Sequence, residues 1–219
     1  MNRNQFPGQV VWITGASSGI GEALAVQFAQ EKSKLVLSAR RQNELERVRD
    51  RCLQAGASEV LVLPLDITDQ AAFPTAVEQV KTRFGRIDML INNAGLSQRS
   101  ICVNTEMAVY RTLFEVDVMG QIALTKAVLP GMLAQGSGHI AVTSSVAGKI
   151  GAPQRTGYCA AKHAVMGFFD ALRAEVATRA SALPPSPRAL SALLFLTTRC
   201  AATGQSSIVL IRILPRAWT

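Results

Sequence analysis

Short apolar runs alternate with longer helix-like segments along the first 177 residues of this chain. Apolar strands separated by helices are typical of a parallel sheet that is covered on both faces. The alternation predicts an α/β fold, a Rossmann-like doubly wound parallel sheet in three α/β/α layers. The expected strands span residues 10–14, 34–39, 59–66, 87–91 and 139–143. The later expected helices span residues 43–54, 70–84, 107–134 and 156–177.

A glycine-rich segment, Thr-Gly-Ala-Ser-Ser-Gly-Ile-Gly at residues 14–21, joins the first strand to the first helix. Glycines let backbone N–H groups approach a pyrophosphate, and the start of a helix favours its negative charge. Because the segment lies between a strand and a helix, it predicts a dinucleotide phosphate site. The residues expected there are Gly15, Ser17, Ser18, Gly19, Ile20 and Gly21.

The end of the second expected strand bears on the choice of cofactor. An acidic residue at this place would accept hydrogen bonds from a ribose 2′-hydroxyl and repel a 2′-phosphate. The chain has Ala39 and then Arg40, whose guanidinium suits a phosphate, so NADP(H) is favoured over NAD(H). We assign Arg41 to the start of a solvated helix. The alternative is that both arginines only begin that helix.

Polar residues also follow the third, fourth and fifth expected strands. These are Asp66, the Asn-Asn-Ala-Gly turn at residues 92–95, and Ser144 with Ser145. Ligands of such sheets bind beyond the carboxyl ends of the strands. We therefore expect all of these groups at one site.

Tyr158 and Lys162 are four positions apart in the last expected helix, so they lie on one face, one turn apart. An ammonium group beside a phenol favours the phenolate form, which suits acid–base chemistry. Taken alone, the pair is better explained as a buried tyrosine next to a surface lysine. The pair becomes a catalytic candidate only in combination with the polar groups at the strand ends.

The formal net charge of +8 does not indicate a nucleic-acid partner. Every acidic residue lies at or before Glu175, whereas residues 178–219 contain arginines and no acid. The basic excess therefore belongs to the tail and forms no basic helix face.

The four cysteines and two histidines show no metal-ligand spacing, so we expect no metal and a reducing, cytoplasmic location. We also expect no transmembrane segment, since no run of about 18 apolar residues is present.

The glycine segment, Asp66, the Asn-Asn-Ala-Gly turn, Ser145 and Tyr-x-x-x-Lys occur in an order and spacing that resemble the short-chain dehydrogenase/reductase family. The resemblance covers residues 9–177, and residues 162–175 look like the branch that includes the DHRS7-type members. It implies an NADP-dependent oxidoreductase acting on a small-molecule carbonyl or secondary alcohol. It also implies a homo-oligomer, formed through the helices at residues 107–134 and 156–177.

The resemblance implies a role for each matching residue. Tyr158 is the expected general acid or base, Ser145 binds the substrate oxygen, and Lys162 binds the nicotinamide ribose and supports Tyr158. Ser144 is expected to be structural. The remaining cofactor contacts implied are Asp66, Ile67, Asn93, Ala94 and Gly95.

Asp117 departs from the family pattern, which usually has asparagine at this place near the catalytic lysine. A carboxylate there would stabilise the ammonium of Lys162 and weaken its influence on Tyr158. We therefore include Asp117 among the catalytic positions and expect it to reduce turnover.

The tail is a second departure. Residues 178–219 lack the Pro-Gly loop and the later strands that the resemblance implies, so we divide the chain into a dinucleotide-binding domain, 1–177, and an atypical tail. We interpret the tail as the product of a shifted reading frame, and we expect the C-terminal strands to be missing or non-native. The apolar runs at residues 191–196 and 207–211 could be placed as strands in a structure. The alternative function is an impaired product that binds a dinucleotide weakly or not at all.

Overall fold

The computed structural model describes residues 6–181 and 193–194, with side chains described for residues 6–176. Within these residues, six parallel strands form one sheet in the order β3-β2-β1-β4-β5-β6. Strand β1 pairs with β2 on one side and β4 on the other, so that Trp12 lies opposite both Val36 and Leu90. The strands are β1 (Val10–Thr14), β2 (Lys34–Ser38), β3 (Glu59–Val62), β4 (Met89–Asn92), β5 (His139–Val142) and β6 (Leu193–Leu194). This sheet confirms the doubly wound α/β fold.

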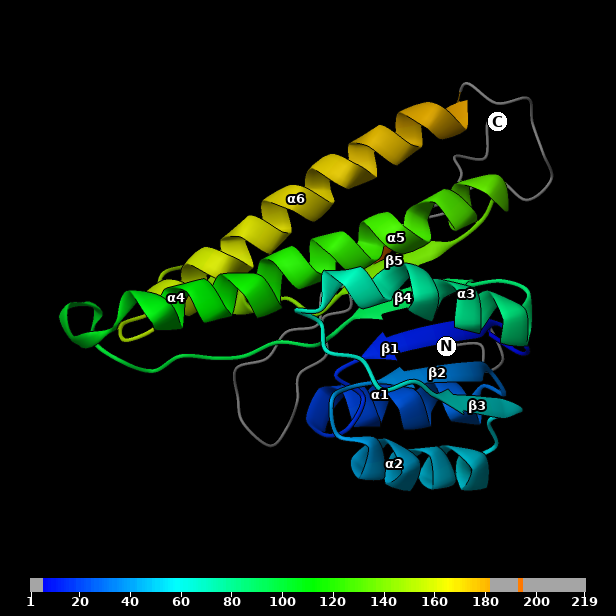
Figure 1. Ribbon diagram of the computed structural model, residues 1–219. Helices are drawn as coiled ribbons and strands as arrows, with labels where there is room; N and C mark the ends of the chain where they lie inside the picture. The colour runs from blue at the N-terminus through cyan, green and yellow to red at the C-terminus, as the bar shows by residue number, and fades with distance from the viewer. Residues whose placement is uncertain (1–5, 182–192, 195–219) are drawn as a thin grey trace.

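Helices cover both faces of the sheet, which gives the three layers visible in Figure 1. Helices α1 (Gly19–Gln30) and α2 (Gln42–Ala55) lie on one face. The opposite face carries α3 (Phe73–Phe84), α4 (Met107–Phe114), α5 (Gly120–Ala134) and α6 (Thr156–Ser181). A π-helical turn, η3 (Glu115–Met119), joins α4 to α5, and three 3-10 turns complete the list: η1 (Gln70–Ala72), η2 (Cys102–Asn104) and η4 (Val146–Gly148).

Two hydrophobic cores follow from the alternation of side chains along the strands. Val11 and Ile13 of β1 belong to the core under α1 and α2. Val10 and Trp12 belong to the core under α3, α5 and α6. Trp12 is fully buried and donates its indole N–H to Ser38 Oγ at 2.9 Å, so its one polar group is satisfied. The carboxyl ends of the strands are therefore held in place from both sides.

Several expected elements have different bounds in the structure, and two of these differences lie close to the strand ends and to Asp117. The expected strand at residues 59–66 ends as β3 at Val62, although the N–H groups of Leu63 and Leu65 still donate to Leu37 O in β2 and to Ala39 O just beyond it. The expected helix at residues 107–134 is interrupted by η3, which contains Asp117. Such π-turns change the direction in which a helix presents its side chains, and they are frequent at functional sites.

The combined helical region Met107–Ala134 meets the length and composition expected of a membrane-crossing helix, so the sequence-based expectation of no such segment is not confirmed. The same region supplies Leu113, Leu124 and Val128 to the buried interior. Packing against the sheet therefore accounts for part of its apolar character.

The prediction for the tail is only partly within the described residues. Helix α6 continues to Ser181, and β6 pairs with β5 through Leu193 and Leu194, so one of the two apolar tail runs does contain a short strand. The expectation of missing or non-native later strands concerns residues 182–192 and 195–219, and these lie outside the described residues, as does the run at residues 207–211.

Candidate active site

A cavity of about 700 Å³ opens at the carboxyl ends of β1, β2, β4 and β5. It gathers most of the residues that the sequence singled out from distant parts of the chain. Those lining it are Gly15, Ser17, Ser18, Ile20, Arg40, Asp66, Ile67, Asn93, Ala94, Gly95, Tyr158 and Lys162. Four predicted residues, Gly19, Gly21, Asp117 and Ser145, are not part of its lining.

The glycine segment packs so tightly against the Asn-Asn-Ala-Gly turn that two of its positions require glycine. Gly15 has a φ of +64°, and a Cβ atom on it would lie 2.9 Å from the backbone Cα of Ala94. A Cβ atom on Gly21 would run into the carbonyl oxygen of Gly15. These contacts therefore hold the glycine segment against the Asn-Asn-Ala-Gly turn at the edge of the cavity.

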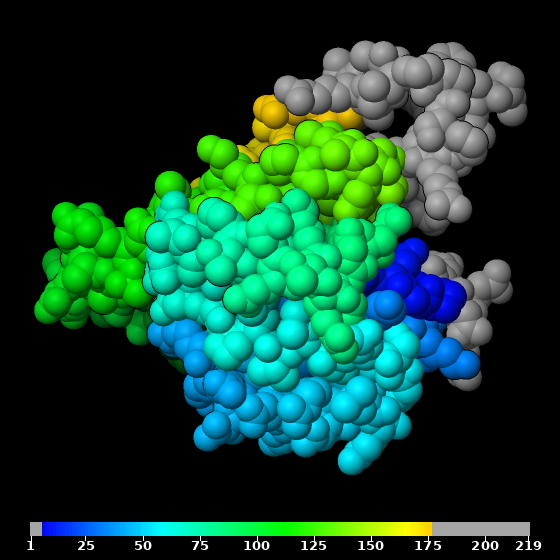
Figure 2. Space-filling view, turned by 45° about the vertical axis from the view of Figure 1, so that its right-hand side comes forward, coloured from blue at the N-terminus to red at the C-terminus, as the bar shows by residue number. Residues whose placement is uncertain are grey.

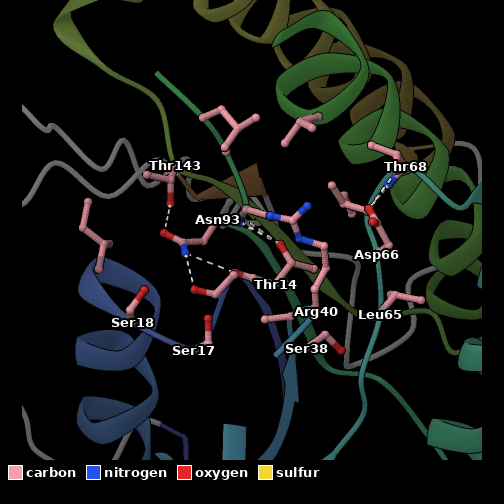
Figure 3. A pocket seen from close by; sticks show the side chains of 18 of the residues that line it. Thr14, Ser17, Ser18, Ser38, Arg40, Leu65, Asp66, Thr68, Asn93 and Thr143 are labelled. Carbon is pink, nitrogen blue, oxygen red and sulfur yellow. Dashed lines mark hydrogen bonds between the residues drawn. The ribbon is translucent and has the colours of Figure 1, made fainter. Parts of the chain in front are cut away.

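Thr14 and Asn93 connect the ends of three strands through their side chains (Figure 3). Thr14 Oγ1 donates to Ile91 O at 3.2 Å and accepts from the N–H groups of Asn93 and Ala94 at 3.0 and 3.1 Å. Asn93 Nδ2 donates to Thr14 O at 3.1 Å, and Asn93 Oδ1 accepts from Thr143 Oγ1 at 3.0 Å. The sequence analysis missed Thr14 and Thr143. Their position at the end of a strand was the available signal.

Arg40 and Asp66 lie at the end of the cavity near β2 and β3. Figure 3 shows the Arg40 side chain extending from the end of β2 into the cavity. The N–H of Thr68 donates to Asp66 Oδ1 at 2.9 Å and, together with the Thr68 hydroxyl and the positive charge of Arg40, holds the pKa of Asp66 below its usual value. Asp66 is therefore a charged hydrogen-bond acceptor at neutral pH.

Arg41 was assigned to a solvated helix, but the structure also places it on the cavity wall. It is the N-cap residue of α2, and its Nη2 lies 3.5 Å from Ser17 Oγ. Arg47 donates to the backbone oxygen of Ser17 at 3.3 Å and pairs with Glu22 at 2.8 Å. The glycine loop thus has cations on the side that faces β2, which the sequence order alone did not reveal.

Tyr158 and Lys162 project from α6 toward the opposite end of the cavity. Lys162 is buried, and its Nζ lies 5.6 Å from the centre of the Tyr158 ring. The ammonium donates to Thr143 O at 3.2 Å. The expected placement of the two side chains on one helix face is therefore what the structure shows.

Asp117 lies behind Lys162 on the π-turn, fully buried. Its Oδ1 accepts from the N–H of Leu96 at 2.6 Å, and its Oδ2 lies 3.5 Å from Lys162 Nζ without a hydrogen-bond partner. Burial raises the pKa of Asp117, although the Lys162 ammonium and the Leu96 N–H act in the opposite direction. The carboxylate contacts the catalytic candidate Lys162 and also fixes the backbone just after Gly95.

The two neighbouring serines are placed differently from what the sequence suggested. Ser144, expected to be structural, lines the cavity, and its buried hydroxyl has no hydrogen-bond partner. Ser145 is buried at the start of η4, where its Oγ accepts from the N–H of Ala147 at 3.2 Å. Both hydroxyls are within two residues of Thr143, which contacts Asn93 and Lys162.

A second cavity of about 470 Å³ adjoins the first and shares Leu96, Ser97 and Thr112 with it. Its other lining residues are Gln98, Arg99, Ser100, Ala108, Val109 and Leu113. These belong to the loop after β4 and to α4, whose first turns project from the body of the molecule in Figure 2. Space therefore continues beyond Tyr158 toward a partly apolar wall.

None of the histidines and cysteines in the described part of the chain lines the first cavity. His163 bonds through Nδ1 to Cys159 O at 2.8 Å, and Cys52, Cys102 and Cys159 are unbridged. Among residues 6–176, no three His, Cys, Asp or Glu side chains are grouped so that they could hold a metal ion.

Comparison with known proteins agrees with this geometry. The family model for short chain dehydrogenases matches residues 9–184. The human protein named dehydrogenase/reductase SDR family member 7 is 52% identical over 177 residues, which cover 80% of this chain and 52% of that protein. A Drosophila melanogaster protein named dehydrogenase/reductase SDR family protein 7-like is 46% identical over 180 residues, covering 81% of this chain and 55% of its own length.

The fold is also found among solved structures. The crystal structure of levodione reductase matches with a TM-score of 0.72 and 36% identity, over 75% of this chain and 64% of that one. A putative short-chain alcohol dehydrogenase from Sinorhizobium meliloti matches with a TM-score of 0.76 and 25% identity, over 81% and 70%. The chain spans about half the length of the curated relatives it matches. On this evidence the chain belongs to the short-chain dehydrogenase/reductase family of oxidoreductases, which use NAD(P)(H), and it is similar to the DHRS7-type members.

Proposed function

We propose that this protein is an NADP(H)-dependent oxidoreductase that interconverts a carbonyl compound and its secondary alcohol, with Tyr158 as general acid and base. The observation that carries the proposal is the single cavity that joins the glycine loop, Asp66 and Asn93 to the Tyr158–Lys162 pair. Carbonyl reduction needs a hydride donor at the carbonyl carbon and a proton donor at the adjacent oxygen, so the cofactor site and the acid–base group must border one space, as they do in this cavity.

The residues present fit a dinucleotide. Gly15 and Gly21 pack so closely against neighbouring backbone that a Cβ atom would collide there, and the start of α1 lines the same cavity. Asp66 would accept a hydrogen bond from the adenine amino group, and Asn93, Ala94 and Gly95 would line the middle of the cofactor. When bound, the nicotinamide delivers a hydride to the carbonyl carbon or removes one from the alcohol carbon.

The choice of NADP(H) rests on charge at the end of β2. Ala39 offers no carboxylate to repel a 2′-phosphate, and both Arg40 and Arg41 line the cavity there. Arg40 also lies near enough to Asp66 to lower the pKa of that carboxyl. Two guanidinium groups would bind the phosphate through charge-assisted hydrogen bonds.

The proton chemistry is assigned to Tyr158. In the reducing direction its phenol donates a proton to the carbonyl oxygen, which becomes the hydroxyl of the product alcohol. In the oxidising direction the phenolate accepts that proton. Lys162 supports the phenolate through its positive charge and would bind the nicotinamide ribose, while Ser145 would hydrogen-bond the substrate oxygen.

A second proposal, an impaired enzyme, is favoured by one observation. Asp117 Oδ2 lies 3.5 Å from Lys162 Nζ, so a negative charge competes with Tyr158 for the influence of the ammonium. Turnover would then be low even though the cofactor binds.

The test is a titration of the purified chain with NADPH and NADH, followed by fluorescence, and then NADPH oxidation with a panel of aldehydes and ketones. The first proposal expects tighter binding of NADPH and oxidation that Tyr158→Phe abolishes. Binding without turnover supports the impaired enzyme. Absence of binding to either nucleotide, in a chain shown to be folded by circular dichroism, contradicts the first proposal and is the outcome expected of an impaired product that binds no dinucleotide.

A further inference from the structure

Two arginines at the substrate end of the site, Arg99 and Arg155, have no acidic partner among the described residues. Every Asp and Glu of the chain lies between Glu22 and Glu175, within the described part, so residues outside it add no carboxylate side chain. Most other described arginines do pair with carboxylates, namely Arg47, Arg49, Arg51, Arg83, Arg86 and Arg173. No described carboxylate therefore neutralises these two guanidinium groups, and their charge is available to a ligand.

Unpaired arginines border the two ends of the site. Arg40 and Arg41, for which the described residues offer no carboxylate within ion-pair distance, line the end assigned to the ribose phosphate. Arg99 lines the second cavity, and Arg155 contacts both Tyr158 and Ser97, a residue that the two cavities share. The phosphate of the cofactor would account for the arginines at the first end. The unpaired arginines at the second end have no such explanation.

The loops that carry these arginines are fastened to each other. Ser100 N donates to Gln154 O at 2.9 Å, and Arg99 Nε donates to Gln154 Oε1 at 3.3 Å. Arg155 Nη1 donates to Ser97 Oγ at 2.6 Å. Each guanidinium has five N–H donors, and these contacts use one from each, so most donors remain for a ligand.

The backbone of Gln154 is held in a conformation that is locally unfavourable. Its φ is +62°, a left-handed conformation that is unfavourable for a residue with a side chain. Such conformations persist where the surroundings over-determine them, and they are concentrated at functional sites. Here the bonds to Ser100 and Arg99 supply that constraint and present Arg155 toward Tyr158.

The position of Arg155 relates it directly to the reacting group. Its Cζ lies 5.7 Å from the centre of the Tyr158 ring, and Lys162 Nζ lies 5.6 Å from the same centre. Arg155 is half-buried, whereas Lys162 is buried. A substrate whose carbonyl oxygen meets the Tyr158 hydroxyl would therefore have a guanidinium beside it, with the apolar residues Leu96, Val109 and Leu113 further along.

We propose that the preferred substrates are oxo acids and the corresponding hydroxy acids, whose carboxylate is bound by Arg155 with help from Arg99. The inference rests on the proposed oxidoreductase function and names its substrate class. The fork of a guanidinium matches a carboxylate in two parallel hydrogen bonds, and half-burial strengthens them relative to bulk water. The apolar wall suits the hydrocarbon body of the same molecule.

A competing explanation is that Arg155 only fastens the two loops through Ser97. Matched substrates separate the two ideas, because a fastening role affects an acid and its ester equally. The probes are benzoylformate, benzoylpropionate and benzoylbutyrate, each measured beside its methyl ester with NADPH. The readout is the ratio of kcat/KM for the acid to kcat/KM for the ester, so general damage to a variant cancels.

For the wild-type chain we expect at least one of the three acids to be preferred over its ester by about 10-fold or more. In Arg155→Gln, which keeps an N–H donor for Ser97 but removes the charge, this preference should fall by about 10- to 100-fold. Arg155→Lys should retain part of it. Arg111→Gln, a change in an exposed arginine of α4 that lines neither cavity, should leave the ratio unchanged. The wild-type preference should also weaken as salt is raised.

A ratio near one for all three pairs, or a preference that survives Arg155→Gln, overturns the proposal while the oxidoreductase function stands. If no substrate is turned over, calorimetric binding of each acid and ester to the folded chain decides instead. Tighter binding of an acid than of its ester, lost in Arg155→Gln, supports the anion site. The absence of turnover then counts against the oxidoreductase function alone. Equal binding of acid and ester overturns the anion site.

Discussion

Lys162 Nζ lies 3.5 Å from Asp117 Oδ2 in the interior, where the two side chains are 5% and 0% exposed. Water cannot screen this pair, so each charge acts strongly on the other and on the nearby Tyr158 ring. The pair therefore links the π-turn between α4 and α5 to the acid–base group on α6.

Asp117→Asn should raise turnover. The amide keeps an oxygen for the Leu96 N–H and removes the negative charge beside Lys162, so the ammonium can act more fully on Tyr158. We expect kcat to rise by about 10- to 100-fold, because only part of the roughly 10²- to 10⁴-fold contribution of general acid–base catalysis depends on the influence of Lys162. The measurement is NADPH oxidation at saturating substrate. Glu115→Gln, an exposed change on the same π-turn, is the control, and an unchanged kcat in Asp117→Asn contradicts the assignment.

The same substitution should change how stability depends on pH. Burial raises the pKa of Asp117 in the folded state, so the folded protein holds this proton more tightly than the unfolded chain. Its contribution to stability is then fully present below the unfolded pKa of about 3.9 and is lost as the pH rises through the higher folded value. Asp66, whose pKa is lowered, contributes in the opposite sense.

Urea unfolding of the wild type and Asp117→Asn across this pH range isolates the effect, since Asp66 is common to both. The stability of the variant relative to the wild type should increase as the pH rises. A difference that is constant with pH means that Asp117 has the same pKa in both states.

Arg40→Gln should weaken NADPH binding far more than NADH binding. Loss of a charge-assisted hydrogen bond to the 2′-phosphate costs roughly 1.5–3 kcal/mol, which is about 10- to 100-fold in Kd. Arg41→Gln should have an effect of the same sign, since Arg41 lines the same wall. Arg86→Gln, at the opposite end of the strands beside Asp88, serves as the control. Equal loss of NADPH and NADH affinity contradicts a phosphate-binding role.

Gly21→Ala and Gly167→Ala form a matched pair of glycine substitutions in helices. A Cβ atom at residue 21 meets the backbone of Gly15, so the loop must shift, and we expect lower stability and loss of nucleotide binding. A Cβ atom at residue 167 meets nothing within 4 Å, so alanine there should stabilise α6 by about 0.5–1 kcal/mol. Thermal unfolding and the NADPH titration check both outcomes.

Ser145→Ala and Ser144→Ala test which serine serves the substrate. If Ser145 binds the substrate oxygen, its loss should lower kcat/KM by about 10²-fold, the scale seen for removal of one oxyanion hydrogen bond. Ser144→Ala should have little effect, or a small gain in stability, because its buried hydroxyl has no partner. The reverse pattern assigns the role to Ser144, which lines the cavity.

The sequence by itself determined the parallel sheet, because apolar strands between helices can be buried in few other ways. It also determined which strand ends carry polar groups, and it placed Tyr158 and Lys162 on one helix face, since helical periodicity is local. It could not give the bounds of β3 or the π-turn, because these depend on hydrogen bonds to other segments.

Only the tertiary structure decided how distant groups meet. It brought Thr14, Asn93 and Thr143 into one hydrogen-bonded cluster and placed Asp117 against Lys162, across 45 positions of sequence. It also put Arg41 on the cavity wall and Arg155 beside the Tyr158 ring. These contacts join residues from separate loops and helices, and their distances follow from how the layers pack rather than from any local pattern.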